Sequence, residues 1–315
     1  MYQRLSPHTR AVLQGLLVAL LWSTSWIFIK FGLSNIPPLT FAGLRYMLAF
    51  LCLLPIAARG GHLRSLSQLA PRKWGTLLTL GFILYTVAQG SQFVGLRYLP
   101  AVTTNLLISF TSIVVTLLGI VLLREHPTRM QWGGIALYLV GVLVYFYPVS
   151  FSPEQLIGVL VIGVNIAANT TGTLIGRSVN RAGDLHPIAV TTATMGIGAI
   201  CLLAGGIVLQ GLPALTVSEW AMIGWLAVVN TALGFTLWNN VQRTLSAMEA
   251  SMINNTMLIH IPILALLFLG ESISEKALLG MVLAGVGIVA VQMGRGIQQR
   301  RAAKSPNVAD VVSES

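Results

Sequence analysis

Polar side chains that could bind a solute stand at helical spacing inside long apolar stretches of this sequence. One set follows i, i+4, i+7, i+11 spacing and consists of Asn105, Ser109, Ser112 and Thr116. That spacing places all four on one face of a helix. Because polar groups in hydrocarbon cost free energy unless they face protein or water, such a face either lines a solute cavity or forms hydrogen bonds between packed helices.

Amides and aromatic rings supply further candidates at the same kind of spacing. One face of an apolar segment carries Tyr85, Gln89 and Gln92, and two other segments carry the pairs Asn165 with Asn169 and Trp22 with Trp26. These groups offer hydrogen bonds and aromatic surface without net charge, which suits an amphipathic or zwitterionic ligand. A packed core with satisfied amides remains the alternative for each of them.

Two titratable residues stand inside apolar segments. His260 could carry protons, but at 100° per residue it faces away from Ser251 and Asn255, so a structural role is favoured. Arg45 would lie ~10 Å deep, where it could attract anionic substrates or extend to the headgroups. No carboxylate lies deep in a segment, Glu249 being the nearest, so neutral, zwitterionic or anionic substrates are favoured over cations.

The apolar stretches themselves predict an all-α integral membrane protein. Of 315 residues 55% are hydrophobic and 9% charged, against the roughly 25% charged that is typical of soluble domains. Runs of about 20 apolar residues can each cross a bilayer. Ten transmembrane helices are predicted: 11–33, 38–58, 74–96, 101–123, 130–148, 155–176, 187–210, 219–241, 247–269 and 276–294.

The charges predict an orientation. The formal net charge is +10, and fifteen of the 19 Lys and Arg residues fall on one side of the predicted spans, with two on the other side and two inside spans. Because basic loops stay cytoplasmic, both termini are placed in the cytoplasm of a cell whose inner membrane holds the protein. The partner of the positive charge is then the lipid bilayer rather than nucleic acid.

An internal copy is visible at an offset of 146 residues. It superposes Trp74 on Trp220, Arg97 on Arg243 and Glu125 on Glu271. A five-helix unit with an odd number of spans must enter the membrane from opposite sides in its two copies, which predicts two inverted five-helix repeats. The predicted organisation is a cytoplasmic N-terminus (1–10), two repeats (11–148 and 149–294) and a disordered basic tail (295–315).

The same offset pairs the polar faces. Ser251, Asn255, Leu258 and Pro262 correspond to the first polar set, and Thr231, Phe235 and Trp238 correspond to the tyrosine and glutamine face. The candidate substrate-binding residues are Trp22, Trp26, Tyr85, Gln89, Asn105, Ser109, Asn165, Asn169, Trp238, Ser251 and Asn255, and His260 and Arg45 are a candidate proton or anion site. Glycines spaced along the fifth and tenth helices predict a scaffold or an oligomer surface.

The chain resembles the EamA-type transporters of the drug/metabolite transporter superfamily over nearly its whole length. The likeness lies in the run Leu21-Trp22-Ser23-Thr24-Ser25-Trp26 and in helices that end in Glu125 and Glu271, each followed by a helix opening on glycine. The resemblance implies a basket of ten helices that carries small metabolites, often amino acids, and frequently exports them. One departure is Thr116, which stands where the second repeat has the family's proline, Pro262.

A secondary transporter of small metabolites is therefore expected, with export of amino acids or related compounds by alternating access as the leading hypothesis. The alternatives are a multidrug exporter, a metabolite importer of the same fold, and a non-transporting scaffold. The sequence carries no zinc motif, activated nucleophile or nucleotide-binding loop, so an enzyme is not expected and no step needs a cofactor. A homo-oligomer is left open.

Overall fold

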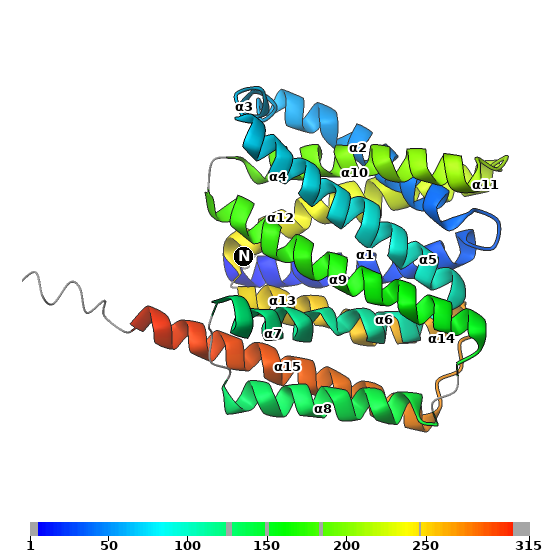
Figure 1. Ribbon diagram of the computed structural model, residues 1–315, viewed down its shortest axis with the longest axis vertical. Helices are drawn as coiled ribbons and strands as arrows, with labels where there is room; N and C mark the ends of the chain where they lie inside the picture. Colours follow the sequence, from blue (N-terminus) through cyan, green and yellow to red (C-terminus); the bar gives the residue numbers. More distant parts are fainter. Residues whose placement is uncertain (1–5, 124–127, 149–150, 183–184, 246, 305–315) are drawn as a thin grey trace, which may run out of the picture.

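The computed structural model describes residues 6–123, 128–148, 151–182, 185–245 and 247–304, and it is a bundle of helices that run roughly side by side (Figure 1). The first repeat contains α1 (Pro7–Gly32), α2 (Pro38–Arg59), α3 (Arg64–Ser67), α4 (Pro71–Gly81), η1 (Phe82–Gln89), α5 (Gly90–Tyr98), α6 (Ala101–Ser109), α7 (Thr111–Leu123) and α8 (Arg129–Phe146). The second contains α9 (Pro153–Ala182), α10 (Pro187–Gln210), α11 (Val217–Trp225), η2 (Leu226–Leu233), α12 (Gly234–Thr244), α13 (Ala247–Asn255), α14 (Met257–Phe268) and α15 (Glu275–Lys304).

Local sequence explains where these helices begin. Proline occupies the first position of α1, α2, α4, α9 and α10, where its missing N–H costs nothing and its fixed φ suits the helix. Thr128 and Thr216 begin α8 and α11 with capping boxes, because each threonine and the residue three positions later exchange hydrogen bonds. Prolines and capping threonines therefore mark the starts of these helices.

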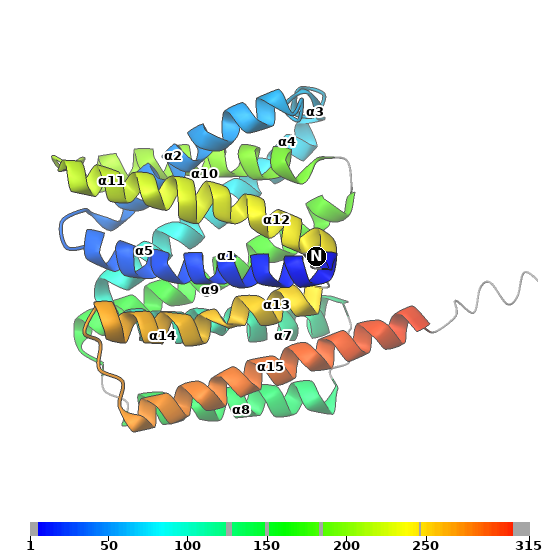
Figure 2. The ribbon, with the colours of Figure 1, turned by 180° about the vertical axis from the view of Figure 1, so that it is seen from behind.

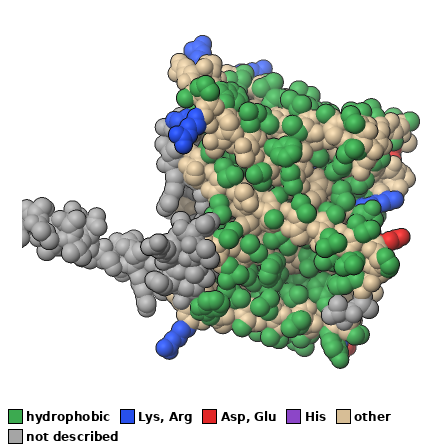
Figure 3. Space-filling model, viewed as in Figure 1, with side chains coloured by type: hydrophobic (Ala, Val, Ile, Leu, Met, Phe, Trp, Pro, Cys, Tyr) green, Lys and Arg blue, Asp and Glu red, His purple; other side chains and the backbone are tan. Residues whose placement is uncertain are grey.

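Eight helices in the described part of the chain are long and apolar enough to cross a membrane, and two shorter apolar helices cover 101–115 and 252–268. Together they correspond to the ten predicted spans. Large apolar side chains such as Leu143, Leu160 and Val208 are exposed, and hydrophobic atoms cover much of the surface in Figure 3. Such a surface fits lipid contact and confirms the all-helical membrane fold.

The fourth and ninth spans differ from the prediction, because each narrows to a single tight turn at the same place in its repeat, with helical φ and ψ retained at Phe110 and Thr256. These two tight turns are called the helix breaks below. α6 ends before Phe110 and α13 ends before Thr256, positions that are 146 residues apart. At each break the backbone changes to i→i−3 hydrogen bonds, from Phe110 N to Leu107 O (3.1 Å) and from Thr256 N to Ile253 O (3.0 Å). The first repeat thus breaks without the proline that the second repeat carries at Pro262.

The third and eighth spans carry a second irregularity. In both, the middle turns are π-helical, η1 in the first repeat and η2 in the second. Such wide turns are rare and often lie at functional sites. The four irregular spans are thus equivalent pairs, and the departures from ideal helices sit in the middle of the bundle rather than at its ends.

The fifth and tenth spans form a tight pair at one edge of the bundle, where α8 packs along α15 more extensively than any other described pair (Figure 2). A Cβ added to Gly141 would lie 2.5 Å from Ala284 N and 2.6 Å from Gly280 O. The predicted small-residue faces therefore cover each other within one chain, which supports the scaffold interpretation of these glycines over the oligomer surface.

Most Lys and Arg side chains visible in Figure 3 gather at the end of the bundle where α1 begins and α15 ends. The backbone of α15 continues to Lys304, so the first ten residues of the predicted disordered tail are helical. A single basic end agrees with the charge bias of the sequence, and the cytoplasmic placement of both termini stays a prediction.

Candidate functional site

A polar cluster lies where α2 meets both π-helical segments. Arg45 is only 5% exposed, and its Nε donates to Thr231 Oγ1 in η2 at 2.9 Å. Tyr46 donates from Oη to Gln89 Oε1 in η1 at 2.6 Å, and its ring stands edge-on to that of Tyr85 with centroids 5.5 Å apart. The predicted residues Arg45, Tyr85 and Gln89 are thus brought together at a contact between the two repeats.

An aromatic cluster lies where α1 packs against η2 and α12. Trp22 packs against Phe235 and Trp238, with ring centroids 5.5 and 5.3 Å apart, and its Nε1 donates to Asn230 O at 2.9 Å. The Asn230 amide donates in return to Leu21 O and, at 3.2 Å, to Thr24 Oγ1. α1 is therefore fixed to the second repeat at the π-helical segment, and the predicted Trp22 and Trp238 share one surface.

The helices beside the two breaks are in contact, since α6 packs against α14. Asn105 Nδ2 of α6 points to Met257 O at the start of α14, 3.4 Å away. Nearby polar atoms are buried without a hydrogen-bond partner: Asn255 Nδ2, Thr111 Oγ1 and His260 Nδ1. Unpaired buried donors and acceptors are rare in native proteins and call for an explanation. The side chain of Ser251 lies outside the described residues.

Other predicted site residues form hydrogen bonds or pack within the protein itself. Ser109 Oγ lies 2.6 Å from Leu106 O and 3.2 Å from Tyr138 Oη. Asn165 is fully buried, donating to Ala88 O in η1 at 2.6 Å and accepting from Asn169 Nδ2 at 2.9 Å. Trp26 is buried in the main apolar core. Hydrogen bonds within the bundle and ordinary packing account for these four residues, including Asn169.

Charged residues at the end opposite the basic end make contacts that the sequence did not predict. Glu271 accepts from the backbone N–H groups of Ala101 (2.7 Å) and Val102 (3.2 Å), so a carboxylate of the second repeat caps α6 of the first. Lys30 Nζ donates to Leu96 O and Leu99 O at 2.7 and 2.6 Å. The ammonium group of Lys30 thus binds backbone carbonyls at the end of α5.

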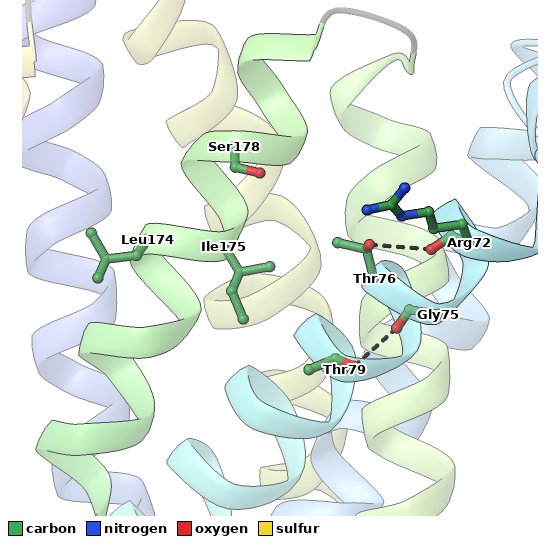
Figure 4. Close-up of a pocket in the computed structure, with 7 residues that line it drawn as sticks. All are labelled: Arg72, Gly75, Thr76, Thr79, Leu174, Ile175 and Ser178. Atoms are coloured by element: carbon green, nitrogen blue, oxygen red, sulfur yellow. Dashed lines mark hydrogen bonds between the residues drawn. The ribbon is translucent and has the colours of Figure 1, made fainter. Parts of the chain in front are cut away.

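An open groove of about 600 Å³ runs between α4 of the first repeat and α9 of the second. Figure 4 shows residues of the two helices on either side of it. Its lining is Arg72, Gly75, Thr76, Thr79, Leu174, Ile175 and Ser178. Thr76 and Thr79 turn their hydroxyls back to carbonyls of their own helix, at 3.3 and 2.9 Å. None of the predicted substrate residues lines this groove, which opens at a boundary between the repeats.

Comparison with known proteins assigns the same architecture to both halves. The model of the EamA-like transporter family matches residues 9–147 and again residues 155–293. A solved crystal structure is similar in fold, with a TM-score of 0.67 at 19% sequence identity, covering 91% of this chain and 99% of that one.

Two bacterial transporters are similar in sequence to most of this chain. The uncharacterized transporter YoaV of Bacillus subtilis is 26% identical over 86% of this chain and 92% of its own length. The uncharacterized inner membrane transporter YedA of Escherichia coli is 26% identical over 95% of this chain and 97% of its own length. Their names give no substrate.

Proposed function

Because the chain belongs to the EamA-like transporter family, and is therefore a multi-pass membrane transporter, we propose that it exports amino acids or related small metabolites across an inner membrane by alternating access. The two inverted halves rock about a substrate site in the middle of the bundle. Both termini lie in the cytoplasm in this proposal, as the charge bias of the sequence favours.

One observation carries the proposal. The spans that depart from ideal helices are equivalent pairs in the two repeats, and unpaired buried polar atoms lie beside the helix breaks. Transporters built from inverted repeats place their substrate site near the midplane, at helices that depart from regular geometry, and a buried side-chain group without a protein partner can bind the solute there. Asn255 Nδ2 supplies such a group beside the second break, and Thr111 Oγ1 supplies one beside the first.

Substitution of Asn255 with leucine tests this function. Because its Nδ2 has no partner, leucine of similar size removes no hydrogen bond of that nitrogen, and folding should be retained. We expect cells that overproduce the wild type to accumulate one or a few amino-acid-like compounds outside. The Asn255→Leu variant should accumulate at least about tenfold less, as expected if the substitution weakens solute binding by about 1.4 kcal/mol or more. Metabolite analysis of the medium at equal membrane abundance measures it.

Asn254→Leu is the matched control, since it makes the same change one residue along α13 on a different face, and it should export as the wild type does. Full export by Asn255→Leu would show that the second helix break does not belong to the substrate site. External accumulation of many unrelated lipophilic compounds would favour a multidrug exporter. Internal accumulation instead would favour a metabolite importer.

The groove between α4 and α9 is the proposed entrance for substrate from the cytoplasmic side. A Cβ at Gly75 would meet nothing within 4 Å, so tryptophan can occupy the groove without disturbing the fold. We expect Gly75→Trp to lower the export rate about tenfold at unchanged abundance, because it obstructs the path. Gly163→Trp on α9 is the control, since a Cβ there is equally open but lies outside the lining. Equal rates for the two variants would exclude the groove as the entrance.

A further inference from the structure

Arg45 is a buried cation whose charge is not balanced within the described part of the chain. The acidic side chains that the structure describes are Glu154, Glu219, Glu271 and Glu275. Three of them lie in the first turn of a helix, and Glu271 lies in the connection between α14 and α15. No salt bridge is described for Arg45, which stands eight positions into α2. A guanidinium stays protonated in proteins, and an unpaired charge inside a membrane protein is costly and marks a functional site by default.

The protein contacts of Arg45 leave one end of its side chain free. Nε is satisfied by Thr231, and the guanidinium carbon lies 5.4 Å from the ring centroid of Tyr46 and 6.0 Å from that of Phe93. Ring faces attract a cation but do not neutralise it. In the described part of the chain no hydrogen bond joins Nη1 or Nη2 to another residue, and neither atom is among the fully buried unpaired atoms. The two terminal nitrogens therefore keep a small accessible surface.

Nη1 and Nη2 of Arg45 match the two oxygens of a carboxylate, and the hydrogen bond from Nε to Thr231 holds the guanidinium in place. Arginine binds carboxylates through a pair of parallel N–H···O bonds, and it does so best where the fork is held in place. The bond from Nε orients the guanidinium plane, and the Tyr46 hydroxyl is already engaged with Gln89. We propose that Arg45 binds the carboxylate of the transported solute, so that the substrates are carboxylate-bearing metabolites.

Arg45 lies at a contact between the two repeats, so a carboxylate bound there would affect transport. Thr231 Oγ1 donates to Leu226 O at 2.8 Å, a bond that spans five residues within η2. Arg45 belongs to the first repeat, so its bond to Thr231 connects the repeats at a π-helical segment. A carboxylate on the guanidinium would thus act on the contact between the two halves. This inference rests on the proposed function for its transport meaning, but the binding can be measured without transport.

The test is thermal stabilisation of the purified full-length chain in detergent by three matched probes: 3-phenylpropionate, 3-phenylpropionamide and 3-phenylpropylamine. We expect the carboxylate to raise the Tm of the wild type and the amide and amine to leave it unchanged. In Arg45→Gln the stabilisation should be lost or need at least about tenfold more carboxylate, since a charge-assisted pair is removed. Arg129→Gln, an exposed arginine at the start of α8, is the matched control and should behave as the wild type.

The Tm without a probe separates binding from packing. If Arg45 serves the substrate, Arg45→Gln should melt no lower than the wild type, because the removal of an unbalanced buried charge offsets the loss of the hydrogen bond to Thr231. Each of four results would overturn the inference. Two concern the probes: the carboxylate and the amide stabilise the wild type equally, or no probe stabilises it. Two concern Arg45→Gln: its Tm without a probe is lower than that of the wild type, or the carboxylate still stabilises it. Arg45-dependent binding without any export would contradict the proposed function alone, whereas export without Arg45-dependent binding would contradict only this inference.

Discussion

Replacing Gly287 with valine is expected to unfold the protein at temperatures where the wild type is stable. A Cβ at Gly287 would lie 2.6 Å from Gly134 O and 2.6 Å from Tyr138 N. Both are backbone atoms, so no side-chain rotation relieves the overlap and α8 must move away from α15. Overpacking a well-packed interior costs about 1–3 kcal/mol, and we expect the upper part of this range or more. Tryptophan fluorescence of the purified protein during heating measures the fall in Tm.

Gly285→Val is the matched control for this prediction. It makes the same change on the same helix, but a Cβ there meets nothing within 4 Å. Its Tm should therefore stay close to that of the wild type. Equal melting of the two variants would show that the contact between α8 and α15 does not need a glycine at position 287.

Replacing Glu271 with alanine should destabilise the start of α6, although Glu271 belongs to the second repeat and α6 to the first. α6 begins after Pro100, which has no side chain that can cap a helix. Glu271 supplies the missing acceptor to two backbone N–H groups and places negative charge at the positive end of the helix. Loss of such a cap costs about 1–2 kcal/mol. Hydrogen exchange at Ala101 and Val102 should accelerate, and the Tm should fall.

Two further variants make the Glu271 prediction specific. Glu271→Gln keeps an oxygen acceptor without the charge and should lie between the wild type and Glu271→Ala. Glu275→Ala removes an exposed carboxylate at the start of α15 and should leave exchange at α6 unchanged. Unchanged exchange at Ala101 in Glu271→Ala would mean that α6 does not depend on the second repeat.

The outline of the fold could be predicted from the sequence because its signals are local or periodic. Apolar runs bounded by proline give the spans, and a Trp, an Arg and a Glu in one register give the duplication. The bends could not be predicted, since nothing at Phe110 marks a break and the π-helical turns have no residue signature. The 146-residue offset predicts only that an irregularity found in one repeat recurs in the other, as the two helix breaks do.

The candidate site was predictable only in part, for a physical reason. Helical spacing shows which residues share a face, and it correctly grouped Tyr85 with Gln89. It does not show which partners satisfy a polar group, so Asn165, whose amide is bonded to Ala88 O in η1, could not be separated from Asn255, whose Nδ2 has no partner. The cap by Glu271 was missed because its partner lies 170 residues away.

The seam between α8 and α15 has the geometry of an isologous interface. A Cβ on Gly134 would meet Gly287 O, and one on Gly287 would meet Gly134 O; Gly141 and Gly280 are related in the same reciprocal way. The 146-residue offset exchanges these two pairs, so the seam is self-complementary, as the contact of a two-fold symmetric dimer must be. A single five-helix chain could make the same seam with a second copy of itself only if the two copies crossed the membrane in opposite directions. Joining the copies in one chain removes that requirement for dual topology and lets each half acquire its own side chains.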